Sequence, residues 1–170
     1  MALTKIADGG MPAGAVLQVV QDFESAASSE SLAAGAFSAA ILSATITPFS
    51  SSSKILILCT LHLTTGNQTA GVAAVLKRNS TSICLGDASG NMTRGSGGGT
   101  GAAISSRLIS NIQMSFLDTP STASAITYTA HGKTGYNSTQ TLYWNRELDT
   151  TNGSQVTRVP STLTLMEIAG

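Results

Sequence analysis

The run at residues 54–63 most constrains the fold, because apolar residues occupy both faces of a strand-like alternation. Every odd position from 55 to 63 is apolar, and Leu56 and Leu58 are apolar on the opposite face, where Thr60 and His62 follow. A period of two is typical of a β-strand. A strand apolar on both faces needs cover from a second layer or from a neighbouring subunit. We therefore predict an oligomer interface at Leu56, Leu58 and His62.

Short strand-like runs recur along the chain at the spacing of about 8–12 residues that is typical of all-β sandwiches. Turn signals separate them, among them residues 87–91 and 132–135. The Ala/Ser-rich stretch 24–40 is expected to be irregular or extended, since alanines bury little. The nine predicted strands are 16–21, 41–47, 54–64, 72–78, 81–86, 112–117, 125–130, 141–145 and 163–168. We predict an all-β, single antiparallel β-sandwich, jelly-roll-like, over residues 15–170.

Residues 1–14 contain Gly9, Gly10, Pro12 and Gly14, which is too much glycine and proline for a regular element. We predict an extended N-terminal arm that attaches the domain to another protein. The 170 residues suffice for one domain with a core.

The composition is unusually poor in charge. Charged residues are 11% of the chain, against about 25% in typical soluble domains, and nine basic residues balance nine acidic ones. This argues against nucleic acid as a partner and favours association with other proteins. No run reaches the length of about 18 apolar residues needed for a membrane span, and no secretory signal is visible, so we expect folding in a cytoplasm. Cys59 and Cys84 are expected to be small buried hydrophobes, although a disulfide between them stays open.

No motif predicts a cofactor or a metal. Residues 95–101 are glycine-rich but lack the Lys-Ser/Thr ending of a phosphate-binding loop, so a flexible surface loop is the better interpretation. His62 and His131 are not at ligand spacing with another His, Cys or carboxylate.

A catalytic pair of acids is not expected either. Glycan hydrolysis needs two carboxylates about 5–10 Å apart across one bond. The acidic residues of the β-rich part stand mainly at turns and strand ends, where capping and ion pairing are their ordinary roles. These residues are Asp87, Asp118, Glu147, Asp149 and Glu167.

Six ordered blocks of the sequence are residues 16–21, 43–57, 85–94, 116–128, 145–146 and 161–168. Together they resemble a family of virion proteins of tailed bacteriophages, notably phages of marine and freshwater bacteria, which occur as tail-fibre or fibre-tip modules. Within these blocks Met92 replaces a residue that is more often basic in the family, and Trp144 stands where a small aliphatic is usual.

The resemblance implies a structural virion protein, most simply a trimeric tail-fibre or fibre-tip component in host attachment, joined to other phage structural proteins through the N-terminal arm. A capsid decoration or head-fibre protein is the nearest alternative, and a glycan-degrading enzyme or a self-associating domain without receptor affinity are weaker ones. A host glycan or protein is the expected receptor. Candidate receptor contacts are Tyr136 in a polar loop, Trp144, Asn91 and Arg94.

Overall fold

The computed structural model describes residues 11–66, 70–100 and 107–170, and over these residues it contains strands, turns and loops but no α-helix. The all-β prediction is confirmed at this level. In this part of the chain no helix has the length and hydropathy to cross a membrane. The eleven strands among the described residues are β1 (Val16–Glu24), β2 (Ser28–Leu32), β3 (Leu42–Ile46), β4 (Lys54–Thr65), β5 (Val72–Arg78), β6 (Thr81–Ile83), β7 (Gly97–Gly99), β8 (Ser110–Asp118), β9 (Ile126–Thr134), β10 (Gln140–Trp144) and β11 (Ser161–Ile168).

The strands form two antiparallel sheets. Sheet A has the order β1-β11-β4-β10-β2, with β8 on the other edge of β4, and sheet B has the order β3-β9-β5-β6, with β7 also paired to β5. Strand β4 is the centre of sheet A, because β11 and β10 share one of its edges and β8 takes the other. The long run that opened the sequence analysis therefore has neighbours on both edges.

Residues from both sheets form one hydrophobic cluster. The odd positions of β4 point into it, and Ile55, Ile57 and Leu61 have no exposed surface. Sheet B contributes the alternate positions of β5 and β9, including Leu76 and the fully buried Tyr128. The alternation of each strand thus decides which side chains enter the shared core.

The buried carboxylate of Asp118 is stabilised by a hydrogen bond and an ion pair. Asp118 accepts a hydrogen bond of 2.6 Å from the hydroxyl of Tyr128 and pairs with Arg78 at 3.0 Å. Burial and the hydrogen bond to Asp118 both raise the pKa of Tyr128. Asp118 is at the end of β8, so this group ties the edge of sheet A to sheet B.

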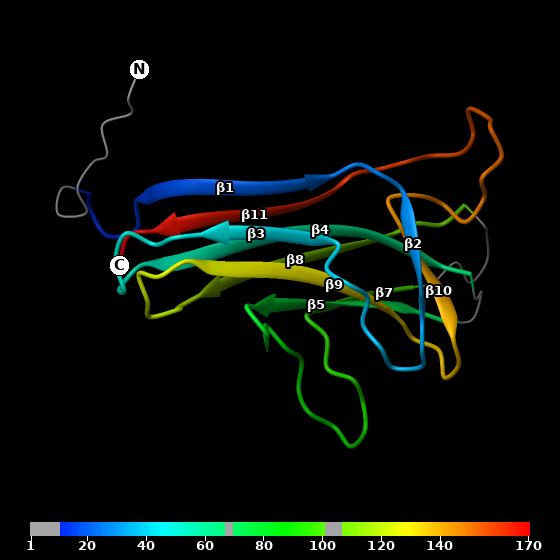
Figure 1. The fold of residues 1–170 in the computed structure, drawn as a ribbon, viewed down its shortest axis with the longest axis horizontal. Coiled ribbons are helices and arrows are strands. Elements are labelled where there is room, and N and C mark those ends of the chain that lie inside the picture. The colour runs from blue at the N-terminus through cyan, green and yellow to red at the C-terminus, as the bar shows by residue number, and fades with distance from the viewer. Residues whose placement is uncertain (1–10, 67–69, 101–106) are drawn as a thin grey trace.

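The two ends of the described chain meet. The amide of Gly14 donates to the carbonyl of Ala169, and the amide of Ala169 donates to Ala15. In Figure 1 the start of β1 and the end of β11 lie at one end of the molecule, while the orange loop at residues 145–160 lies at the opposite end. The predicted arm falls mostly on residues 1–10, outside the described residues.

All nine predicted strands are present, and two further strands were not predicted. β2 lies within the Ala/Ser-rich stretch and β7 within the glycine-rich segment expected to be a flexible loop. β7 is ordered because its glycines fit beside β8: a Cβ on Gly97 would come within 2.7 Å of Ile112. The flexible-loop prediction is therefore wrong for Gly97–Gly99.

The predicted turn at residues 132–135 is also wrong, because β9 continues to Thr134. Gly132 is needed there for close packing: a Cβ would lie 2.7 Å from Leu142 and 3.0 Å from Leu63. The glycine therefore marks a tight approach between the sheets rather than a turn.

Both cysteines are free thiols. Cys59 is buried on β4, and burial raises its pKa to about 12. Cys84 follows β6 and is half-buried, with a positive φ of 54°. The prediction of a buried hydrophobe holds for Cys59 and only in part for Cys84.

Candidate interaction surfaces

The outward side of sheet A carries a row of apolar side chains that crosses four neighbouring strands. The register pairs Val19 of β1 with Met166 of β11, Met166 with Leu56 of β4, and Leu56 with Leu117 of β8. Strands about 4.8 Å apart bring such cross-strand neighbours into contact range. The row is therefore a continuous apolar band across the sheet.

We call the outward positions of these four strands the outer face. Five of the seven large hydrophobic residues exposed in the described part of the chain lie on it, with exposed fractions from 39% for Leu58 to 59% for Phe23. Lys54 is its one charged residue, and it contains no carboxylate. The outer face consists of Val16, Val19, Gln21, Phe23, Thr162, Thr164, Met166, Ile168, Lys54, Leu56, Leu58, Thr60, His62, Asn111, Gln113, Ser115 and Leu117.

The outward side of sheet B differs. Val75 and Lys133 point away from the core by the alternation of β5 and β9, yet their exposed fractions are 1% and 7%. The chain itself therefore covers part of this side around Val75 and Lys133. Of the two sheets, sheet A is the one that leaves large apolar side chains uncovered.

The structure places all three predicted interface residues on the outer face. Leu58 is exposed, whereas Leu56 and His62 are half-buried. The ring of His62 donates from Nδ1 to the carbonyl of Pro160 at 2.8 Å, and its amide donates to the hydroxyl of Ser161 at 3.0 Å. His62 thus marks the margin where the face meets the 145–160 loop.

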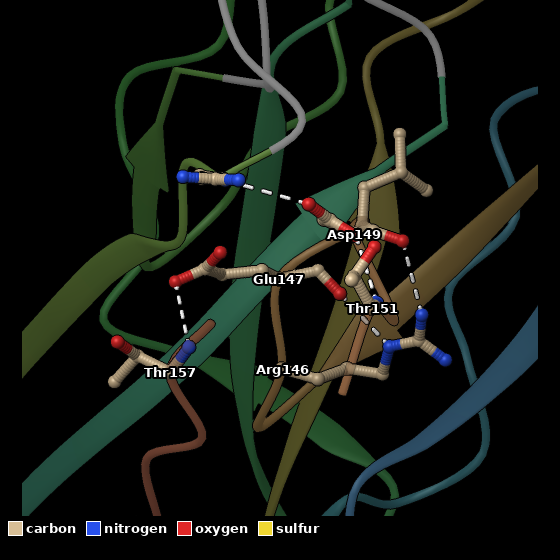
Figure 2. A network of polar contacts seen from close by, with 7 residues as sticks. Arg146, Glu147, Asp149, Thr151 and Thr157 are labelled. Carbon is tan, nitrogen blue, oxygen red and sulfur yellow. Dashed lines mark hydrogen bonds and ion pairs between the residues drawn. The ribbon is translucent and has the colours of Figure 1, made fainter. Parts of the chain in front are cut away.

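The 145–160 loop is folded by its own charged side chains (Figure 2). The guanidinium of Arg146 donates to the carbonyls of Glu147 and Leu148 at 2.9 and 3.1 Å. It also lies 5.0 Å from the centre of the Tyr143 ring, within cation–π range. Arg146 therefore fixes the start of the loop against β10.

The two acids of this loop serve the same purpose. Glu147 accepts a hydrogen bond of 2.9 Å from the amide of Thr157, and Asp149 accepts one of 2.8 Å from the amide of Thr151. Asp149 also contacts Arg107 at 3.4 Å. The hydrogen bonds from Thr151, helped by Arg107, lower the pKa of Asp149. In Figure 2 dashed lines join the two carboxylates to different partners, with Glu147 bonded to Thr157.

The other acids predicted to have structural roles also engage the backbone or buried partners. The carboxylate of Asp87 accepts from the amide of Ala88, and that of Glu167 accepts from the amide of Phe49 and the amide group of Gln18. Within the described residues, no three His, Cys, Asp or Glu side chains gather as a metal site.

Tyr136 lines a pocket of about 480 Å³ on the outward side of sheet B. Met92 and Thr93 line it from the opposite loop, so the structure brings Tyr136 close to the segment between Asn91 and Arg94. Asn91 and Arg94 are exposed, and Arg94 donates to the carbonyl of Gly86 at 2.7 Å. The green loop at residues 84–96 projects from the body of the molecule in Figure 1.

Trp144 is not among the residues that line this pocket. Trp144 lies on β10, where its cross-strand partners are Leu63 of β4 and Ser28 of β2. It is half-buried and packs against the core. Three of the four predicted receptor contacts thus belong to one region of the surface, and Trp144 to another.

Lys133 lines the same pocket and was not singled out in the sequence. The Gly-Lys-Thr-Gly sequence indicated an exposed turn, in which a lysine is ordinary. Its position on β9 makes it a buried cation instead. Local pattern carries no signal for this, because the loop that covers Lys133 is 40 residues away in sequence.

Comparison with known proteins gave no matching family model and no matching curated protein. The resemblance to phage virion proteins therefore remains a sequence-based prediction.

Proposed function

We propose that the chain is a structural virion protein of a tailed bacteriophage, a homotrimeric tail-fibre or fibre-tip component in host attachment. The observation that supports this best is the outer face of sheet A. It presents a four-strand apolar band in which Val19 and Leu117 are exposed, with exposed Leu58 beside the band, and a neighbouring subunit would cover this surface.

The occupant we propose for the outer face is a further copy of this chain. In a trimer, the outer faces of three copies would turn toward one common axis, and none of them brings an acidic group to it. Lys54 at the margin is the single charge of each face. The chain has no net charge, so copies do not repel one another at long range. Four strands and four rows of side chains span an area of about 19 by 25 Å. Such an area, about 475 Å², is smaller than the about 600–1,000 Å² that a specific interface covers on each partner, so residues around the face must extend the contact.

We also infer the finer fold, a jelly-roll-like β-sandwich with residues 15–170 as its single domain. The support is the common hydrophobic cluster, to which both sheets contribute buried side chains. The sheet order, with β11 between β1 and β4, requires long crossovers of the kind found in such folds.

The arrangement of the ends supports an attachment role. The first described residues and the C-terminus lie at one end, and the 145–160 loop lies at the other (Figure 1). A protein fixed to a particle through its N-terminal arm would present that loop away from the particle. The structural roles of the acids in this loop support binding rather than catalysis.

Two measurements test the proposal. Light scattering of the purified protein is expected to give three times the 17.3 kDa mass of one chain. Gold-labelled antibody against the protein is expected to mark the tail fibre of the phage by electron microscopy. Label on the head instead would identify a capsid decoration or head-fibre protein, and a concentration-independent monomer would refute the assembly.

A further inference from the structure

The side chain of Lys133 is largely buried, and the described part of the chain offers its ammonium no carboxylate. Only 7% of Lys133 is exposed. Its Nζ donates to the hydroxyl of Thr93 at 2.8 Å and lies 5.6 Å from the centre of the Phe37 ring. The two ion pairs among the described residues are Arg78–Asp118 and Arg107–Asp149, and neither includes it.

A cation in this position is costly for the free protein. An ammonium has three N–H donors, and Thr93 accepts from one. Burying a charge without an opposite charge opposes folding. Burial also lowers the pKa of Lys133, and no neighbouring acid offsets this effect. An anion placed against Nζ would remove much of the cost, since it would supply the missing charge and accept the free N–H groups.

The pocket beside Lys133 has room for such an anion together with the molecule that bears it. Its volume of about 480 Å³ falls in the range of small-molecule sites, about 300–1,000 Å³. Lys133 is its one charged lining residue, and Met92 is the one large aliphatic side chain.

We propose that this pocket binds a saccharide that carries a carboxylate, with the carboxylate at Nζ of Lys133 and the sugar ring against Tyr136. This assignment names a receptor class for the proposed attachment function and in that sense rests on it. Aromatic faces pack against the C–H faces of sugars. The hydroxyl of Thr93 and the side-chain amide of Asn137 suit the hydroxyls of such a ligand.

The lining favours a saccharide over an acidic peptide. Peptide recognition draws its affinity from apolar anchors in well-packed pockets or from strand addition. This pocket offers Met92 alone as a large aliphatic contact, and Met92 is 75% exposed. Small polar side chains around one cation and one aromatic ring instead match a polar, singly charged sugar unit.

Calorimetric titration of the purified full-length protein with trigalacturonate tests the proposal. We expect saturable binding, with little binding of the neutral galactotriose. Lys133→Met should weaken trigalacturonate binding about tenfold or more, because it removes a charge-assisted hydrogen bond. Lys77→Met is the matched control, since Lys77 is a half-buried lysine of neighbouring strand β5 that does not line the pocket, and it should bind like the wild type.

Tyr136→Ala is a second variant at the rim of the pocket, and it should also weaken binding if Lys133→Met fails to fold. Absence of trigalacturonate binding to the folded wild type, or unchanged binding in a folded Lys133→Met variant, would overturn the proposal. Equal affinity for acetate or for a Glu-containing peptide would overturn the saccharide assignment. Light scattering on the same samples separates this result from the assembly, because loss of binding leaves the mass unchanged.

Discussion

Leu58→Asp is the most direct test of the outer face. Leu58 lies near the middle of sheet A on the central strand β4, beside the band that contains Leu56. The substitution leaves the core untouched, because the core-facing neighbours of Leu58 are Ile57 and Cys59. We expect a folded chain that no longer assembles.

The expected effect follows from the exposure of Leu58. Complete burial of a leucine side chain contributes about 1.5–3 kcal/mol. Because 39% of Leu58 is exposed in one chain, about 0.6–1.2 kcal/mol of this is gained only on association. A carboxylate left without a partner in the interface adds a cost of about 1–3 kcal/mol. The total of about 2–4 kcal/mol per copy corresponds to a roughly 30- to 700-fold weaker contact.

Size-exclusion chromatography with light scattering measures the mass, and circular dichroism checks that the variant retains its β-structure. Ser80→Asp is the matched control, because Ser80 is exposed in the turn between β5 and β6 and adds the same charge away from the outer face. The control should assemble like the wild type.

An oligomer of unchanged mass for folded Leu58→Asp would refute the argument that this face is covered by a copy of the chain. Dissociation of the Ser80→Asp control would refute it as well, since the effect would then come from net charge rather than from the face.

Three further predictions concern stability and reactivity. Gly132→Ala should lower the free energy of unfolding, measured in urea, by about 1–3 kcal/mol through overpacking. Gly98→Ala should change it by less than about 0.5 kcal/mol, because a Cβ there would lie an ordinary 3.7 Å from its nearest neighbour, the carbonyl oxygen of Val72. Equal effects of the two substitutions would refute the packing argument. A thiol reagent at pH 8 should label Cys84 rapidly and Cys59 only after denaturation, because burial raises the pKa of Cys59 to about 12; two fast thiols in mass spectra would contradict this. Burial, with a smaller contribution from a neighbouring lysine, lowers the pKa of His131 below its ordinary 6.5. The unfolded state therefore takes up the proton first, and the free energy of unfolding should fall as the pH drops from 6.5 through the lowered pKa. A His131→Gln variant whose stability depends on pH as steeply as that of the wild type would count against this prediction.

The strands that could be predicted are those whose side chains alternate strongly. β4, β9 and β11 carry buried residues at every second position, and that pattern follows directly from one face meeting a core. β2 and β7 have the sequences SSESL and GGG and carry no such alternation. Their strand state comes from pairing with β10 and β5, which is information from distant parts of the chain.

The residues of the candidate surfaces also differ in whether the sequence could predict them. Leu56, Leu58 and His62 could be found because a strand apolar on both faces is visible in the sequence itself. Lys133 could not, because its burial depends on Thr93 and Phe37, which reach it from separate loops. Glycine next to Lys133 favoured a turn, although the physical reason for the glycine is the lack of space beside Leu142.

The pairing of β1 with β11 has a consequence for biosynthesis. The first strand of the chain is hydrogen-bonded to the last, with Val19 opposite Met166, and β4 obtains all of its edge partners from strands that follow residue 109. Sheet A therefore cannot close on the ribosome before β11 has been made, and contacts so distant in sequence make folding slow. During that interval the doubly apolar β4 is open to solvent, which makes newly made chains dependent on low concentration or on a chaperone.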